Sequence, residues 1–273
     1  MKRTLFSVLA IAVVGGLVAL YLSSRPTQTQ QAAAVVAPER AATEVTTIRT
    51  EAQATNVAAA PTAAAPAQSE ARIELAQADL DAVTTAGFVE GRHYRRLSPA
   101  QPTSSGPDQV EVNEFFMYSC IHCYNLEPYV HAWLEAKPAT INFVPIPTTW
   151  DEARKLHAQG YYMAEALGKA EEMHMPFFQE MHVNGNYLET PAKMKQFFGR
   201  FNVSGSDFDG LFDSFAMRAK VSRADELGRR YRVDSTPTII INGKYRTDVS
   251  MAGGSPEQLF QLIELLAAAE LGQ

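Results

Sequence analysis

The feature that most constrains this chain is the spacing of its cysteines. The 273 residues include two cysteines, Cys120 and Cys123, with two residues between them. Two cysteines placed at random in a chain of this length would fall three positions apart about once in 140 trials. Their number also excludes a multi-disulfide scaffold and a zinc site made of four cysteines. The pair therefore needs a use of its own.

The residues around the cysteine pair predict a strand that leads directly into a helix. Residues 110–118 are rich in β-branched and aromatic side chains and follow a turn-rich segment, so they predict a buried strand. After the cysteines, apolar residues recur at helical spacing up to Pro138, which predicts a helix over 120–136. Residues 140–146 predict a second strand. Strand, helix and strand in this order are typical of a parallel βαβ unit.

The rest of the folded part is predicted to be a block of helices followed by a return to the sheet. Residues 152–231 contain no convincing strand, and helices are expected over 153–168, 176–182, 190–200 and 207–231, the last with a break inside it. Pro176 is among the expected stops. Asn242-Gly243 is a strong hairpin signal between the predicted strands 238–241 and 244–247. Ser255 as N-cap, followed by Pro256, predicts a last helix.

The N-terminal residues indicate export and a tether. Lys2 and Arg3 precede an apolar run over residues 5–22, which as a helix would span about 27 Å, close to the thickness of a bilayer core. We therefore favour a membrane anchor over residues 1–22, with a cleaved signal as the alternative. The charges place the chain beyond this run outside the cytoplasm, where disulfides are permitted. Residues 23–72, rich in Ala, Pro, Thr and Gln, predict a disordered tether.

The composition of the chain limits the functional classes to which it can belong. With 46% hydrophobic and 20% charged residues, the chain can bury a sizeable core. The net charge is −6, the isoelectric point is near 5.6, and no block of Lys and Arg is longer than a pair. Nucleic-acid binding depends on neutralising phosphates, so we expect no nucleic-acid partner.

The predicted position of the cysteines suits thiol–disulfide exchange. The first turn of a helix leaves N–H groups unpaired and carries partial positive charge, so a thiolate of an exposed Cys120 would be stabilised there. Cys123 would lie one turn deeper on the same face, within reach of Cys120. A structural disulfide across so short a loop would stabilise little, and zinc would need further ligands that the sequence does not identify. Redox chemistry is therefore the favoured interpretation.

Three separated motifs resemble the DsbA family of bacterial periplasmic thiol:disulfide oxidoreductases. They are the run from Glu114 to Tyr124 around the cysteines, the segment 90–97 (EGRHYRRL), and the segment 233–245 (VDSTPTIIINGKY). The resemblance covers about residues 86–271. It implies an α/β, thioredoxin-like fold over that range, with a helical subdomain inserted at about 152–220.

The resemblance also implies roles for the residues around the pair. Cys120 matches the nucleophile, Cys123 the buried resolving cysteine, and His122 a histidine that stabilises the thiolate. Glu114 matches a buried acid that would lie beneath the pair and move a proton to or from Cys123, although it could instead sit at an exposed strand end. No cofactor and no metal are implied.

A second set of residues is implied to bind substrate. Pro237 matches a cis-proline facing the disulfide, and Thr236 before it would offer its backbone to an extended substrate chain. Three positions depart from the family pattern: Ile121 stands where proline is common, Ser119 where an aromatic is usual, and Thr236 resembles the disulfide isomerases. These departures bear on redox potential and on the choice of partner.

The expected function is therefore oxidation of protein dithiols through a mixed disulfide at Cys120. By resemblance, a DsbB-type membrane oxidase would reoxidise the pair, and a monomer would act in the periplasm, tethered to the inner membrane by residues 4–22 or soluble after cleavage. Two alternatives remain open. One is a reductase or isomerase; the other is a peptide-binding module or metal chaperone, for which the Met- and His-rich segment 173–182 could supply ligands.

Overall fold

The βαβ unit around the cysteines is present in the computed structural model of the chain, which describes residues 80–272. Strand β2 is Val110–Phe116, helix α2 is Ile121–Ala136 and strand β3 is Ile141–Pro147. β2 and β3 pair in parallel along their whole length. Every residue of β2 is buried, as expected for a strand with both faces covered.

The two strands belong to a five-stranded sheet in the order β1-β5-β4-β2-β3. Strand β1 is Arg95–Arg96, β4 is Thr238–Ile241 and β5 is Tyr245–Thr247. All neighbours except β2 and β3 are antiparallel. The predicted hairpin joins β4 to β5, with Asn242 and Gly243 at φ 50° and 62°, a conformation that favours these two residue types.

Helices fill the interval between β3 and β4, as the sequence predicts. They are α3 (Glu152–Ala166), α4 (Ala170–His182), α5 (Pro191–Gly199), α6 (Gly205–Phe212) and α7 (Phe215–Arg230). The last helix, α8 (Pro256–Leu271), begins at its predicted cap, where the Ser255 hydroxyl accepts a hydrogen bond from the Gln258 N–H at 3.3 Å. The prediction of an α/β, thioredoxin-like fold with an inserted helical subdomain is confirmed.

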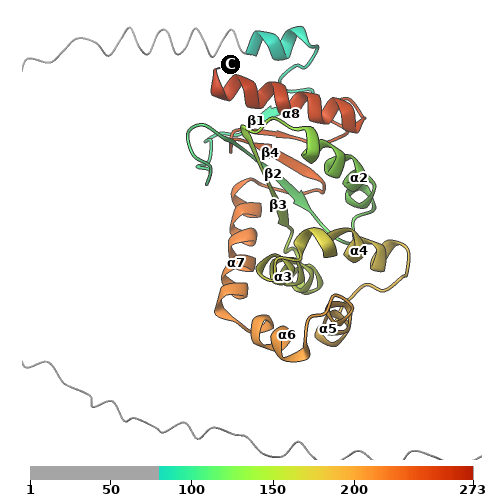
Figure 1. Cartoon of the computed structure of the whole chain (residues 1–273). Coiled ribbons are helices and arrows are strands. Elements are labelled where there is room, and N and C mark those ends of the chain that lie inside the picture. The colour runs from blue at the N-terminus through green and yellow to red at the C-terminus, as the bar shows by residue number, and fades with distance from the viewer. Residues whose placement is uncertain (1–79, 273) are drawn as a thin grey trace, which may run out of the picture. The chain divides into compact units, whose positions relative to one another are not determined.

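Helices cover both faces of the sheet (Figure 1). On one face, Val112 of β2 packs in a core with residues of α2 and α8, including Leu126 and Leu262. On the other face, Phe115 packs with Ala224 of α7. Because alternate residues of a strand point to opposite faces, the even-numbered residues of β2 face α2 and the odd-numbered ones face α7.

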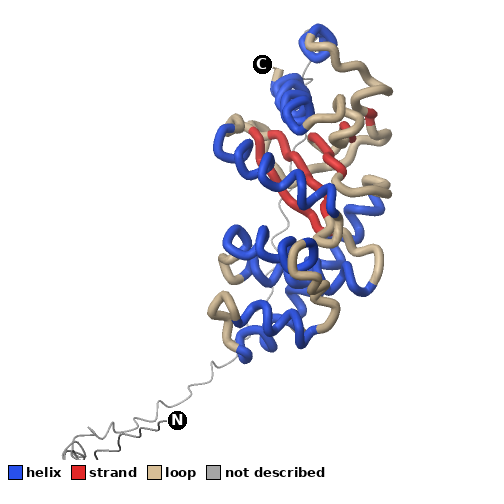
Figure 2. Tube along the Cα trace, turned by 90° about the vertical axis from the view of Figure 1, so that its right-hand side faces the viewer, coloured by secondary structure: helices blue, strands red, loops and turns tan. Residues whose placement is uncertain are grey.

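The helical subdomain lies at one end of the sheet (Figure 2). It has its own aromatic core. Phe177, Phe178, Phe197 and Phe198 are all buried in this core. The core reaches the cysteines through Tyr118, whose ring stacks on Phe177 with centroids 3.8 Å apart. Packing of this subdomain therefore extends up to the residues that precede Cys120.

The prediction that a helix begins at Pro176 is wrong. Helix α4 starts at Ala170 and continues through Pro176. Proline costs the helix the hydrogen bond to the carbonyl four residues earlier, which belongs to the exposed Glu172. Met173 and Phe177 are buried on either side of Pro176. Their packing keeps the helix continuous, because burial of an apolar face contributes more to helix stability than local propensity.

The predicted anchor (1–22) and tether (23–72) lie outside the described residues. Among the helices within residues 80–272, none combines the length and the apolar character needed to cross a membrane.

Candidate active site

The two cysteines lie at the N-terminus of α2 as free thiols. Cys120 is the N-cap residue, and its Sγ accepts a hydrogen bond from the Cys123 N–H at 3.3 Å. A cysteine at this position replaces the usual hydroxyl or carboxylate cap. The capping geometry therefore aims the unpaired N–H groups of the first turn at the sulfur of Cys120.

The environment separates the acidities of the two thiols. A hydrogen bond from the Cys123 thiol lowers the pKa of Cys120 to about 5, against the opposing effect of burial, with help from the Thr236 side chain and the N–H groups of Cys123 and His122. Burial raises the pKa of Cys123, and the neighbouring Cys120 and Glu114 raise it further. In the reduced pair, Cys120 is therefore the thiolate and Cys123 holds the proton.

Cys120 is more covered than the sequence predicts. The sequence predicts an exposed thiol, yet only 8% of Cys120 is exposed, and Cys123 is fully buried. The cover comes from the loop before β4, because Cys120 Sγ lies 3.4 Å from the Thr236 carbonyl oxygen. The peptide bond between Thr236 and Pro237 is cis. The structure thus brings the cysteine together with a loop that lies more than 110 positions away in the sequence.

Glu114 lies inside the fold and not at an exposed strand end, so that alternative is wrong. It is 1% exposed and belongs to the face of β2 that is turned towards α2. Its Oε1 has no hydrogen-bond partner among the described residues. Burial raises the pKa of Glu114 well above its usual range, and the charges of Glu127 and Cys120 raise it further. Glu114 is therefore a weaker acid than an exposed glutamate, and its acidity depends on the charge of Cys120.

His122 contributes through its backbone. Its N–H is one of the groups that lower the pKa of Cys120. Its side chain is exposed and makes no hydrogen bond to Cys120 among the described contacts. The imidazole lies instead on the wall of a groove beside the pair.

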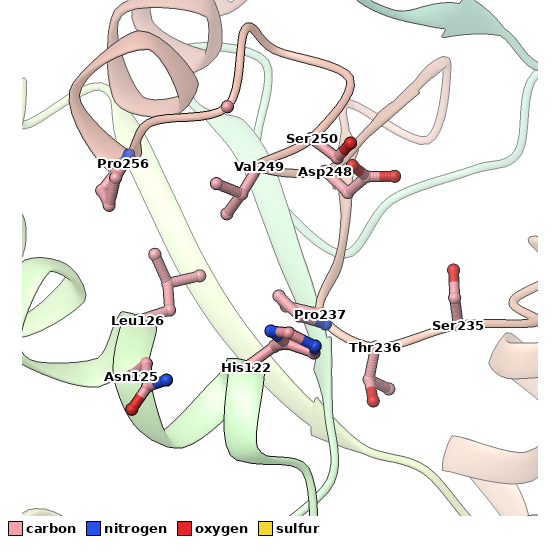
Figure 3. A pocket seen from close by; sticks show the side chains of 11 residues that line it. His122, Asn125, Leu126, Ser235, Thr236, Pro237, Asp248, Val249, Ser250 and Pro256 are labelled. Carbon is pink, nitrogen blue, oxygen red and sulfur yellow. The ribbon is translucent and has the colours of Figure 1, made fainter.

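That groove has a volume of about 540 Å³ and runs between α2 and the segment that joins β5 to α8 (Figure 3). Its α2 wall is made by His122, Asn125 and Leu126, and its other walls by Ser235, Thr236, Pro237, Asp248, Val249, Ser250, Gly254 and Pro256. Apolar and polar groups are mixed on these walls. The groove offers room for a peptide chain next to the residues that cover Cys120.

A buried polar network beneath α2 is a feature that the sequence patterns do not predict. Glu127 accepts a hydrogen bond from His174 Nε2 at 3.1 Å, and His174 Nδ1 lies 2.9 Å from the Tyr118 hydroxyl. One signal is present in the sequence, because Glu127 follows Cys123 by four residues and must share its face of the helix. The partner His174, on α4, cannot be found from spacing.

The histidines of segment 173–182 are engaged in these contacts. His174 bonds to Glu127, and His182 Nε2 lies 2.9 Å from the Tyr118 carbonyl oxygen. Within residues 80–272 there is no group of three His, Cys, Asp or Glu side chains arranged to hold a metal ion. The side chains that could have served as metal ligands therefore tie α4 to the segment before Cys120.

Comparison with known proteins places this geometry among related chains. The sequence model of the DSBA-like thioredoxin domain family matches residues 140–264. The thiol:disulfide interchange protein DsbA of Pseudomonas aeruginosa is 34% identical over 183 residues, which is 67% of this chain and 86% of that protein. DsbA of Pseudomonas syringae pv. tomato is 36% identical over 180 residues, covering 66% of this chain and 83% of the relative.

Solved structures show the same architecture. The crystal structure of Pseudomonas aeruginosa DsbA superimposes with a TM-score of 0.64 at 34% identity, covering 68% of this chain and 95% of that one. The oxidoreductase NmDsbA1 of Neisseria meningitidis gives a TM-score of 0.59 at 26% identity, covering 67% and 93% of the two chains. About a third of this chain lies outside the part matched to these relatives.

Proposed function

This chain belongs to the DsbA family and is a thiol:disulfide oxidoreductase, and we propose that it oxidises substrate dithiols through Cys120. Oxidation is supported as the direction of the reaction by the difference between the pKa values of Cys120 and Cys123. A pKa of about 5 keeps Cys120 ionised at neutral pH, which stabilises the reduced form of the protein. A protein whose reduced form is stabilised is a stronger oxidant when its disulfide is formed.

The proposed reaction moves two electrons from the substrate to the cysteine pair. A substrate thiolate attacks Cys120 Sγ of the disulfide, so that a mixed disulfide forms and the bond to Cys123 breaks. Cys123 leaves as a thiolate and is protonated, with Glu114 as the nearby acid. The second substrate thiolate then attacks the substrate sulfur of the mixed disulfide, and Cys120 departs as a stable thiolate. The substrate leaves with a disulfide, having lost two protons and two electrons.

The expected rise in the reduction potential of the cysteine pair can be calculated from the pKa of Cys120. At pH 7, a thiol with a pKa of about 5 gains about 2.7 kcal/mol from ionisation, whereas an ordinary cysteine gains almost nothing. For a two-electron couple, about 1.4 kcal/mol corresponds to about 30 mV. Ionisation of Cys120 alone is therefore expected to raise the reduction potential by about 60 mV.

Equilibration with glutathione tests the direction. We expect a reduction potential nearer to about −120 mV, which is typical of a DsbA-type oxidant, than to about −270 mV, which is typical of thioredoxin. The fraction of Cys120–Cys123 disulfide is measured by alkylation and mass analysis across ratios of reduced to oxidised glutathione. A potential as low as that of thioredoxin would favour the reductase alternative and overturn the proposed direction.

Substrate is proposed to lie along the groove beside the pair. The support is that Thr236 and Pro237 both line this groove and that Thr236 covers Cys120. An extended chain pairing with the backbone at Thr236 would bring its own cysteine to Cys120 with little dependence on sequence. His122, on the opposite wall, would contact the same chain.

Glu114→Gln is expected to slow dithiol oxidation about tenfold or more, because an amide can neither donate nor accept the proton of Cys123. The measurement is single-turnover oxidation of a dithiol peptide by the oxidised protein, followed between pH 5 and 8. Glu111→Gln is the matched control, since Glu111 is another buried acid of β2 but lies on the face turned away from α2. If Glu114→Gln and Glu111→Gln oxidise the peptide at equal rates, Glu114 does not transfer the proton of Cys123.

The proposed reaction also requires partner proteins and a location outside the cytoplasm. Substrate proteins supply the thiols, and a DsbB-type membrane oxidase would restore the disulfide after each turnover. The apolar run over residues 5–22, with positive charges before it, supports a periplasmic catalytic domain held at the inner membrane by its N-terminal segment. Fractionation of cells that express the full chain would distinguish a membrane-bound form from a soluble, processed one.

A further inference from the structure

A second cavity lies away from the cysteines, where the end of β1 meets the end of α7. Its volume is about 120 Å³, and it shares no residue with the groove beside Cys120. Its polar lining comes from Arg96, Ser98, Gln101, Arg230 and Arg232. No acidic residue lines it, although the chain as a whole has a net charge of −6. The cavity is therefore a local concentration of hydrogen-bond donors on an acidic protein.

The walls of the cavity are held by backbone contacts. The Leu97 N–H donates to the Lys244 carbonyl at 2.7 Å, and the Gln101 N–H donates to the Gly243 carbonyl at 2.9 Å. A Cβ added to Gly243 would clash with the Gln101 carbonyl oxygen, so this segment sits directly against the β4–β5 hairpin. The wall carrying Arg96 and Gln101 is therefore pre-formed.

The opposite wall is fixed as well. Arg232 follows α7 with φ 53°, an uncommon backbone conformation for an arginine. Arg246 Nη1 donates to the Arg232 carbonyl at 2.8 Å, and the Val233 N–H donates to the Gly228 carbonyl at 2.9 Å. These contacts hold the turn that carries Arg230 and Arg232 into the cavity lining.

The arginines are only partly neutralised. Arg96 pairs with Glu90 at 3.1 Å, but both side chains are close to half exposed, and Arg230 pairs with Glu226. Exposed ion pairs of this kind contribute little and exchange readily. Arg232 has no acidic partner within 4.0 Å among the described residues. The three arginines of the lining thus have two carboxylate partners, Glu90 and Glu226, among the described residues. The guanidinium of Arg232 is therefore available to a ligand.

We propose that this cavity binds a phosphate group. A volume of 120 Å³ equals the space of about four water molecules, which suits a single tetrahedral phosphate group. Guanidinium groups bind phosphate oxygens in pairs of parallel hydrogen bonds. A planar carboxylate would engage one arginine fully, whereas a tetrahedral phosphate presents oxygens to arginines from both walls. The hydroxyl of Ser98, which also lines the cavity, supplies a further donor.

Two sources could provide such a group, namely free phosphate and the phosphodiester head group of an anionic lipid. Either would bridge the segment after β1 and the turn after α7, which are about 130 positions apart in the chain. A ligand that binds only the folded protein stabilises it, so binding is expected to raise the unfolding temperature. This effect does not depend on the cysteines or on the direction of electron transfer.

The test uses the full chain in an uncharged detergent, with inorganic phosphate titrated against chloride at constant ionic strength. We expect phosphate to raise the unfolding temperature in a saturable way, and Arg232→Gln to weaken binding about tenfold or more. Arg96→Gln is the second variant and should weaken binding in the same direction. Arg92→Gln, which removes an exposed arginine outside the cavity, is the matched control and should leave binding unchanged.

The same titration with glycerophosphoglycerol, a soluble phosphodiester head group, separates the two sources. Binding at least as tight as that of inorganic phosphate assigns the site to lipid head groups, and weaker binding assigns it to free phosphate. The proposal is overturned if neither compound binds, or if Arg92→Gln weakens binding as much as Arg232→Gln does. Dithiol oxidation by each variant, expected to equal that of the unaltered chain, shows that the fold is intact.

Discussion

Cys120→Ser is expected to lower the rate of dithiol oxidation by at least about 10³-fold, to the level of the uncatalysed exchange. A serine hydroxyl can neither form a disulfide nor leave as a stabilised thiolate, so both steps of the proposed reaction fail. The rate of disulfide formation in a dithiol peptide measures the loss. Ser119→Ala, one residue earlier and without a thiol, is the control and should oxidise the peptide at the normal rate.

Cys123→Ser should instead arrest the reaction at its intermediate. Cys120 keeps its place as the N-cap of α2, but Cys123 can no longer attack the mixed disulfide and release a bound substrate as a thiol, so substrates that lack a second nearby thiol stay attached. When oxidised glutathione first forms a disulfide with Cys120, a protein thiolate attacks Cys120 Sγ and glutathione leaves as a thiolate. The resulting mixed disulfides at Cys120 are expected to accumulate, visible as higher-mass species on non-reducing gels that reductant removes. If Cys123→Ser traps no protein and Cys120→Ser retains activity, the cysteines are ligands or structural groups and the enzymatic mechanism fails.

The sequence carried enough information to place the cysteine pair, because local signals specify each element that holds it. A buried apolar run predicts β2, helical spacing after Cys123 predicts α2, and side-chain alternation alone puts Glu114 on the same face as Val112. These are short-range patterns with one periodicity each. The structure moves the boundaries of β2 and α2 by no more than two residues from the predicted ones.

The features of the site that local sequence patterns do not predict depend on contacts between residues far apart in the chain. The cover over Cys120 comes from Thr236, 116 positions away, which only the resemblance to a known family pointed to. The bond between Glu127 and His174 joins two helices 47 positions apart, and no spacing rule relates them. Pro176 gives a wrong prediction for the same reason, because packing of the buried face of α4 overrides a local signal for a helix stop.

The stability of the reduced protein should depend on pH in a way that the oxidised protein does not share. The pKa of Cys120 is lowered from 9.0 to about 5 in the fold. Between these values the unfolded chain binds a proton at Cys120 and the folded chain does not, so the free energy of unfolding rises with pH. The gain is expected to reach up to about 5 kcal/mol near pH 9 and to be lost as the pH falls through 5.

The oxidised protein is the natural control, because its disulfide has no thiol to titrate while the other ionisable side chains are present in both forms. Urea unfolding of both forms at intervals between pH 4 and 9 should therefore give curves that diverge with rising pH. Above pH 9 the divergence should shrink, since the pKa of Cys123 is raised in the fold and the unfolded chain then loses that proton more readily.

Cys120→Ser separates this effect from any other consequence of breaking the disulfide. Between pH 5 and 9, the stability of this variant should change with pH as that of the oxidised protein does, because the lowered pKa has been removed. Parallel curves for the reduced and oxidised forms of the unaltered chain would mean that Cys120 is not ionised at neutral pH. The thermodynamic basis for an oxidising disulfide would then be absent, whatever the rate of exchange.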